Sequence, residues 1–321
     1  MGILYLLLGL VGLLAGAELA VKGALGLAKH WRWPSWLTGL VLLALGTSLP
    51  EFFVSAVAAP DHPALALGNI FGSNAFNSAV VVGAVLLIHP RVGGQLQASS
   101  WATGLPLFLG AGGAFWCFGG TEIPWQAGPL LLLAYVWMVA VSFRAGKLPV
   151  EEEDMLPEAE SAAPQSPPSW NAWLMVAGFA ILALASEAFK KGALDVAAWM
   201  GWQEGFTGYL VAAVGTSAPE LFTSLRAVRH GHPGAVLGNV FGSNAFNLLI
   251  VGGSAALLAR ESLPPGGLGP MLWVNAVACL LPVLPIYGAR LGRRSLIWSQ
   301  GLGLFMLAGY LASAAWIFRG P

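Results

Sequence analysis

The chain has 321 residues, of which 57% are hydrophobic and only 9% are charged, and its mean hydropathy is +0.72. So few charges cannot cover a water-facing surface, which excludes a soluble globular protein. The 15 basic and 15 acidic side chains balance, which argues against a nucleic-acid partner. The two cysteines, Cys117 and Cys279, imply neither a disulfide framework nor a thiolate metal site.

Apolar runs of about 20 residues recur along the chain and predict membrane-spanning α-helices. The short alternation typical of an outer-membrane barrel does not occur. The first run lacks a basic segment and a cleavage signature, so we expect a retained helix and not a signal peptide. In chain order the predicted spans cover residues 3–28, 36–59, 64–88, 101–118, 125–143, 171–197, 207–228, 234–259, 268–288 and 296–318. The expected fold is an all-α integral membrane protein with ten transmembrane helices.

One polar segment, residues 144–170, separates the fifth span from the sixth. It holds the acidic run Glu151–Asp154 and several prolines, which is typical of a flexible linker. A calcium-regulatory role is the alternative, although the acidic run lacks the glycine-turned geometry of a calcium loop. The linker divides the chain into two five-helix units, residues 1–143 and 171–321.

The basic residues predict how the chain is oriented in the membrane. If the N-terminus lies outside, most basic residues at loops and helix ends lie inside, as the positive-inside rule requires. The two that lie outside are Arg260 and Arg319. The inner set is Lys29, Arg32, Arg91, Arg144, Lys147, Arg226, Arg229, Arg290, Arg293 and Arg294. We therefore expect a multi-pass protein of the inner (plasma) membrane, with both termini outside and the linker in the cytoplasm.

Two motifs occur twice. GTSLPE at 46–51 returns as GTSAPE at 215–220, and GNIFGSNAFN at 68–77 returns as GNVFGSNAFN at 238–247. Because five spans precede the linker, the two copies enter the membrane from opposite sides. The chain is therefore predicted to be an inverted-topology repeat, the organisation of many secondary transporters.

Two further features recur in both halves. Glycines four residues apart predict close helix approach at the second motif, and they are Gly68, Gly72, Gly238 and Gly242. An acid and a lysine at i, i+4 predict a neutralised ion pair in the first helix of each half, namely Glu18 with Lys22 and Glu187 with Lys191. A role of these pairs in ion access or gating is the alternative.

A helix break is predicted at each copy of the first motif, because Pro50 and Pro219 lack a backbone N–H. Irregular backbone at membrane depth is expected only where it lines a cavity or is buried in protein. Glu51 and Glu220 follow these prolines directly, and neither has a basic residue three or four positions away. Burying a carboxylate in the bilayer costs about 2.5 kcal/mol or more, so a bound cation is the simplest compensation.

Other polar side chains of the motifs add hydroxyl and amide oxygens, and no histidine or cysteine stands among them. Calcium and sodium prefer oxygen ligands, whereas zinc, copper or iron would recruit His or Cys. Small polar residues also mediate helix packing in membranes, and this structural role is the alternative. The candidate ligands besides the glutamates are Thr47, Ser48, Ser73, Asn77, Thr216, Ser217, Ser243 and Asn247.

The duplicated GTS-x-PE and GN-x-x-GSN-x-x-N blocks resemble the alpha repeats of the cation/calcium exchanger superfamily, closest to its prokaryotic sodium/calcium exchanger branch. The resemblance covers essentially the whole chain. It implies a core formed by the second, third, seventh and eighth helices, with the first and sixth sliding across it. It also implies Ca²⁺ and Na⁺ as transported ions, without a cofactor or a protein partner.

The resemblance also assigns residues to ions. A calcium site would use Glu51 and Glu220 with backbone carbonyls near Thr47 and Thr216. Flanking sodium sites would use Ala44, Ser48, Ser73 and Glu220 on one side, and Ala213, Ser217, Ser243 and Glu51 on the other. Asn77 and Asn247 would lie at the centre, and asparagine at 247, where some relatives carry aspartate, makes potassium co-transport less expected.

Two alternatives to Na⁺/Ca²⁺ exchange stay open from the sequence, and a third class, an enzyme, is not expected. Protons could replace sodium, because a proton also neutralises a buried carboxylate. A calcium-permeable channel could use the same oxygens, although channel rings come from identical subunits around an axis. An enzyme is not expected, because no Ser or Cys is accompanied by a His at membrane depth and no HExxH motif occurs.

Overall fold

The computed structural model describes residues 1–32, 46–94, 118–144, 166–229, 231, 233–263, 268–285 and 296–319, and this part contains helices and turns but no strand. Five of the described helices are long and apolar enough to cross a membrane: Gly2–His30, Pro63–Ile88, Pro168–Met200, Ala235–Leu258 and Leu296–Arg319. The all-α architecture expected from composition is confirmed. The predicted span at 101–118 lies outside the described residues except for Phe118, and the span at 36–59 is described only from Gly46.

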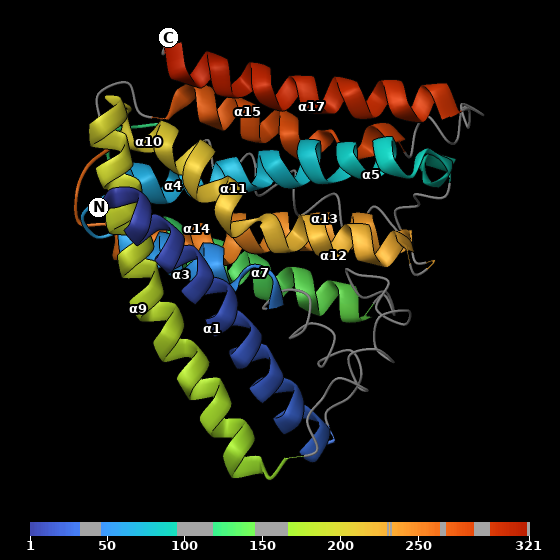
Figure 1. The fold of residues 1–321 in the computed structure, drawn as a ribbon. Coiled ribbons are helices and arrows are strands. Elements are labelled where there is room, and N and C mark those ends of the chain that lie inside the picture. Colours follow the sequence, from blue (N-terminus) through green and yellow to red (C-terminus); the bar gives the residue numbers. More distant parts are fainter. Residues whose placement is uncertain are drawn as a thin grey trace.

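Two long helices lie diagonally across the others (Figure 1): α1 (Gly2–His30) and α9 (Pro168–Met200). They run antiparallel with their backbones in direct contact. A Cβ atom at Gly9 would overlap the backbone of Phe189, and one at Gly23 would overlap the backbone near the start of α9. Small residues therefore allow the two helices to pack as one pair, as they do in many membrane bundles.

The first motif and its repeat lie at interruptions between short helices. In the first copy the backbone turns at Thr47 and Ser48, and α3 (Leu49–Ala58) follows. The second copy lies at the break between α11 (Ala213–Thr216) and α12 (Ala218–Arg229). It is preceded by α10 (Glu204–Thr207) and the π-helix η5 (Gly208–Ala212). The predicted helix breaks are present, and each occurs at a serine two residues before the proline.

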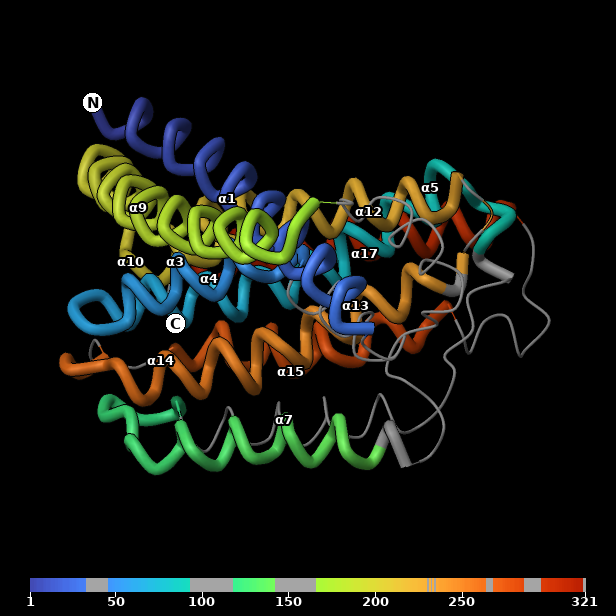
Figure 2. The backbone as a smooth tube through the Cα atoms, turned by 90° about the horizontal axis from the view of Figure 1, so that it is seen from below, coloured from blue at the N-terminus to red at the C-terminus, as the bar shows by residue number. Residues whose placement is uncertain are grey.

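The second motif and its repeat form the two most buried spans. One consists of α4 (Pro63–Ala75), the π-helix η2 (Phe76–Val81) and α5 (Val82–Ile88). The other consists of α13 (Gly234–Phe246), the π-helix η6 (Asn247–Val251) and α14 (Gly252–Leu258). Figures 1 and 2 show that these two spans run in opposite directions. Both change to π-helix at the end of the motif, and π-helical segments often occur at functional sites.

Three helices cover this core. α7 (Ala127–Arg144) packs against α14 and η6, while α15 (Gly269–Leu280) packs on α4 and α17 (Leu296–Arg319) packs on α5 and η2. The N-terminus and the C-terminus lie at the same end of the bundle (Figures 1 and 2). The buried interior is thus formed by the spans that carry the repeated motifs.

The structure corrects one of the two predicted ion pairs. Glu18 and Lys22 pair at 2.5 Å, as expected, but Glu187 pairs with Lys190 at 2.9 Å instead of Lys191. The ammonium of Lys191 lies 4.5 Å from the ring centre of Tyr5 on α1, a cation–π geometry that holds this lysine against the neighbouring helix.

One boundary of the predicted linker also moves. The segment 144–170 lies mostly outside the described residues, but α9 already begins at Pro168, inside the range assigned to the linker. Proline suits the first position of a helix, because its missing N–H would have no intrahelical acceptor there.

Candidate functional site

The two breaks have the same backbone geometry and present their glutamates in the same way. Ser48 has φ −96° and ψ 6°, and Ser217 has φ −88° and ψ 7°. Because Pro50 and Pro219 have no N–H, the carbonyls four residues before them cannot receive the usual helical hydrogen bond. Each glutamate lies in the first turn of the helix that follows, where the helix dipole favours a negative charge.

The structure brings Glu51 and Glu220 together through the serines of the opposite copy. Ser217 donates a 2.8 Å hydrogen bond to Oε1 of Glu51, and Ser48 donates a 3.1 Å hydrogen bond to Oε1 of Glu220. The two carboxylates also interact electrostatically with each other. Both glutamates are completely buried. The predicted meeting of two acidic side chains inside the bundle is therefore present in the structure.

The second oxygen of each carboxylate is buried without compensation. Neither Oε2 of Glu51 nor Oε2 of Glu220 has a hydrogen-bond partner among the described residues. The ion pairs between described residues are Glu18–Lys22, His62–Glu204 and Glu187–Lys190, and none of these involves the two glutamates. A buried carboxylate without a counter-charge is costly, so a cation or a proton at these two oxygens would lower the cost of burial.

The resemblance also assigns the threonines of the first motif and the two alanines that precede it, Ala44 and Ala213. Thr47 and Thr216 are buried, and Thr216 donates a 3.3 Å hydrogen bond to Oδ1 of Asn69, whose amide also donates to the Glu51 carbonyl. Ala213 is buried, and its carbonyl accepts a 2.9 Å hydrogen bond from the Ser217 N–H, which leaves one lone pair available. Ala44 lies outside the described residues.

The serines of the second motif differ from each other. Ser243 donates a 3.3 Å hydrogen bond to Oε1 of Glu220, the glutamate of its own half, whereas the resemblance groups it with Glu51. Ser73 is fully buried, and its hydroxyl has no partner among the described residues. Glu220 therefore receives hydroxyls from both halves, and Ser73 keeps an oxygen free.

Asn77 and Asn247 are buried at the start of the two π-helical segments η2 and η6. Asn77 Nδ2 donates a 3.2 Å hydrogen bond to Oδ1 of Asn244, which connects the two motif copies. The amide oxygens of Asn77 and Asn247 have no partner within the described part of the chain. Both oxygens are available for a ligand in the interior.

Two asparagines that the sequence interpretation did not assign bind the backbone carbonyls of the glutamates. Asn69 Nδ2 donates to the backbone carbonyl of Glu51 at 3.4 Å and to Ser55 Oγ at 3.0 Å. Asn239 makes the same two contacts in the other copy, with Glu220 at 3.4 Å and Ser224 Oγ at 3.1 Å. Both asparagines follow the first glycine of the repeated second motif, and this repetition is the sequence signal that could have identified them.

A second asparagine cluster joins the cores of both halves to α15. Asn244 donates to Ser78 Oγ at 2.8 Å, and Asn74 donates to Oδ1 of Asn275 at 2.9 Å. Asn74 and Asn244 belong to the repeated motif, but Asn275 is a single polar residue in the apolar run of α15. No local sequence pattern identified Asn275.

The donor set of this site suits a hard cation. The residues named above offer carboxylate, hydroxyl, amide and carbonyl oxygens, and the described part of the chain contains no group of three or more His, Cys, Asp or Glu that could hold a metal ion. Oxygen-only ligation favours calcium or sodium over zinc, copper or iron.

The chain is similar to known ion exchangers over nearly its whole length. The family described as sodium/calcium exchanger protein matches residues 1–144 and 170–319. The putative antiporter CaxA of Alkalimonas amylolytica is 31% identical over 293 residues, which cover 90% of each chain. Sodium/calcium exchanger MaX1 of Methanosarcina acetivorans is 27% identical over 291 residues, which cover 79% of this chain and 82% of the relative.

A solved structure of the sodium-calcium exchanger NCX_Mj, soaked with 10 mM Na⁺ and zero Ca²⁺, matches the fold with a TM-score of 0.57. The match has 26% identity and covers 98% of both chains. The resemblance inferred from the repeated motifs is therefore confirmed. This chain belongs to the sodium/calcium exchanger protein family.

Proposed function

We propose that the chain is a secondary active antiporter that exchanges Ca²⁺ for Na⁺ across the membrane by alternating access. The observation that carries this proposal is the pair of buried glutamates, each bonded through Oε1 to a serine of the opposite copy and each with Oε2 unpartnered among the described residues. An oxygen-rich site inside a membrane bundle with two uncompensated negative charges is suited to a divalent cation.

The residues of the proposed ion sites follow the assignments made from the repeats. Calcium is held by Glu51 and Glu220 together with carbonyls near Thr47 and Thr216. One sodium site draws on Ala44, Ser48, Ser73 and Glu220, and the other draws on Ala213, Ser217, Ser243 and Glu51. Asn77 and Asn247 supply amide oxygens between them. No cofactor takes part in this exchange.

The proposed architecture is ten helices in two inverted five-helix units joined by a cytoplasmic linker that follows α7 and ends before α9 begins at Pro168. The opposite directions of the two motif spans support it (Figure 2), as do equivalent helix contacts in the two halves. Gly83 of α5 lies against Gly303 of α17, and Gly253 of α14 lies against Gly128 of α7. The close-packed pair of α1 and α9 is the element that slides across the core.

The proposed orientation places both termini outside the cell, in the plasma membrane. The positions of the termini at one end of the bundle support this arrangement (Figure 1). α17 ends at Arg319, one of the two basic residues assigned to the outer side.

Charge balance makes sodium coupling measurable. Two ionised glutamates are neutralised by one Ca²⁺ or by two protons, whereas three Na⁺, the number usual in this family, leave one positive charge. Moving one elementary charge through 100 mV changes the free energy by about 2.3 kcal/mol. Only the sodium cycle therefore responds to membrane voltage.

The test is calcium uptake into proteoliposomes driven separately by an outward sodium gradient and by an outward proton gradient, at clamped and free voltage. The proposal predicts saturable uptake with the sodium gradient that increases when the interior is made positive, because three Na⁺ leave for each Ca²⁺ that enters. Uptake driven only by the proton gradient and independent of voltage would identify a proton/calcium exchanger. Uptake without any counter-ion would indicate a channel.

Removing a serine that reaches across the two copies should weaken the site. A hydrogen bond to a charged group contributes about 1.5–3 kcal/mol, and 1.4 kcal/mol corresponds to a tenfold change. Ser217→Ala is therefore expected to reduce the apparent affinity for sodium by about tenfold or more, as measured by the sodium dependence of calcium exchange. Ser186→Ala is the control, because among the described residues the Ser186 hydroxyl donates only to the Ala183 carbonyl of its own helix. Equal affinities in the two variants would exclude Ser217 from the sodium site.

A further inference from the structure

The amide of Asn77 is held by one neighbour from the other half of the chain. Its Nδ2 donates a 3.2 Å hydrogen bond to Oδ1 of Asn244, while its own Oδ1 has no partner among the described residues. Both side chains are completely buried. The oxygen of an amide can bind a cation, whereas its nitrogen is only a hydrogen-bond donor. The direction in which the Asn77 amide is turned therefore decides whether it can serve as an ion ligand.

A backbone carbonyl sets the orientation of the Asn244 amide. The amide nitrogen of Asn244 donates to the Asn74 carbonyl at 3.5 Å and to Ser78 Oγ at 2.8 Å. A carbonyl can only accept a hydrogen bond, so the nitrogen of Asn244 faces Asn74 and its oxygen faces Asn77. That oxygen is also only an acceptor, so it turns the nitrogen of Asn77 toward itself. The carbonyl thus fixes the direction of both amides, one after the other.

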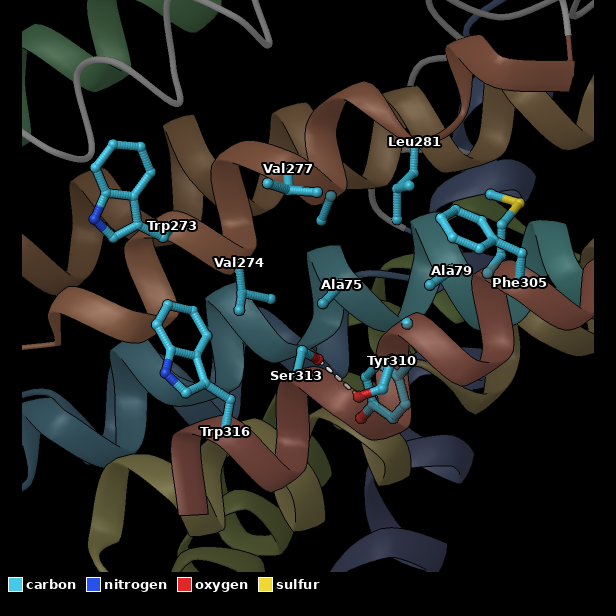
Figure 3. A pocket seen from close by; sticks show the side chains of 13 residues that line it. Ala75, Ala79, Trp273, Val274, Val277, Leu281, Phe305, Tyr310, Ser313 and Trp316 are labelled. Carbon is cyan, nitrogen blue, oxygen red and sulfur yellow. Dashed lines mark hydrogen bonds between the residues drawn. The ribbon is translucent and has the colours of Figure 1, made fainter. Parts of the chain in front are cut away.

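The Asn77 side chain points into the core of the bundle. Ala75 and Ala79, two positions before and after Asn77, line the apolar space between α15 and α17 (Figure 3). Residues two positions apart lie on nearly opposite sides of a helix, so Asn77 points away from α15 and α17. The helix α12, which carries Glu220 in its first turn, packs against η2, where Asn77 lies. The free oxygen of Asn77 is therefore directed to the side of the core helices that carry the glutamates.

The equivalent amide of the other motif copy is not held in this way. Asn247 takes the place of Asn77 in the repeat, and Asn74 takes the place of Asn244. Both amide atoms of Asn247 and Oδ1 of Asn74 lack a partner within the described ranges. The nitrogen of Asn74 donates instead to Oδ1 of Asn275 on α15, at 2.9 Å. A fixed amide therefore distinguishes Asn77 from Asn247.

We propose that Asn244 is a positioning residue for the ion site, because it turns the Asn77 amide so that its oxygen is presented to the bound cation. This inference rests on the proposed function, since it takes Asn77 as a ligand of a transported ion. Asn244 acts through Asn77 and is not itself a ligand. A ligand that is already oriented binds more tightly, because no orientation has to be imposed when the ion arrives.

A double-mutant cycle on cation binding tests this role. Asn244→Leu has a similar size and removes the acceptor, so the Asn77 amide is no longer fixed. We expect the affinity for at least one of the two ions to fall about three- to tenfold, the range of one buried hydrogen bond. Titration calorimetry of the purified protein measures it, with calcium in sodium-free buffer and with sodium in calcium-free buffer. In an Asn77→Ala background the same substitution should change both affinities by less than about twofold, because the residue through which Asn244 acts is gone.

Asn275→Leu is the matched control for the loss of a buried amide. It removes the 2.9 Å hydrogen bond with Asn74 and leaves Asn77 and Asn244 unchanged. Both ion affinities should stay within about twofold of the wild type, whatever the change in melting temperature. If Asn244→Leu does not fold, Asn244→Ala, which is smaller and suits a helix, takes its place in the cycle.

The outcomes separate this inference from the proposed function. Unchanged affinities in the Asn244 variant would overturn the positioning role, and so would an equal loss in the presence and absence of the Asn77 side chain. Both results would leave the exchange of Ca²⁺ for Na⁺ intact. A wild-type protein that binds neither ion would overturn the proposed function and this inference together.

Discussion

Replacing either Glu51 or Glu220 with glutamine is expected to abolish calcium exchange. The substitution keeps the shape of the side chain but removes one of the two negative charges at the site. Loss of one partner from a buried ion pair costs about 3–5 kcal/mol. This corresponds to a loss of calcium affinity on the order of 10²- to 10³-fold. Calcium uptake driven by sodium in proteoliposomes and equilibrium calcium binding both measure it.

Glu204→Gln provides the matched control for these variants. Glu204 is the same residue type in the same chain, but its carboxylate is partly exposed and pairs with His62 Nδ1 at 3.0 Å. Its replacement should leave calcium affinity within about twofold of the wild type, because exposed pairs contribute about 0–1 kcal/mol. Full transport by Glu51→Gln or Glu220→Gln would remove that residue from the ion site.

Substitution of Gly72 by valine is expected to destabilise the whole bundle. A Cβ atom at Gly72 would overlap the backbone carbonyl of Tyr209, and one at Gly68 would overlap that of Gly205. Two helices of different halves therefore meet backbone to backbone at α4 and η5. Overpacking typically costs about 1–3 kcal/mol, and an obstacle made of backbone cannot move aside as a side chain can.

The expected result is a melting temperature lower by roughly 5–10 °C, since 1 kcal/mol shifts the transition by about 2–4 °C in a protein of comparable size. Thermal unfolding of the detergent-solubilised protein measures this shift. Gly301→Val, at a position where a Cβ atom meets nothing within 4 Å, should change the melting temperature little. Equal melting temperatures for both variants would contradict the direct contact between the two halves at Gly72.

The sequence alone predicts that the two glutamates are buried together, because each is a charged residue inside an apolar span. Glu51 and Glu220 follow helix-breaking prolines inside apolar runs without a basic neighbour, so burial and pairing are expected from cost alone. The glycine spacing at Gly68 and Gly72 likewise predicts close helix packing, since only glycine permits contact between backbones.

Contacts between distant segments could not be predicted in the same detail. Ser243 donates to Glu220 rather than Glu51, and Asn275 joins the core from a helix with no motif. Their partners depend on the relative rotation of helices, which no local pattern encodes. Lys191 turns away from Glu187 because Tyr5 on the neighbouring helix offers its ring.

The most direct test of the account is the position of a calcium ion in crystals of the protein, located from its anomalous scattering after soaking in calcium without sodium. The account predicts one peak between Oε2 of Glu51 and Oε2 of Glu220, at about 2.3–2.6 Å from the nearest oxygens. This peak should be lost on soaking with excess sodium. Calcium bound elsewhere in the chain, with both Oε2 atoms remaining without an ion, would contradict it.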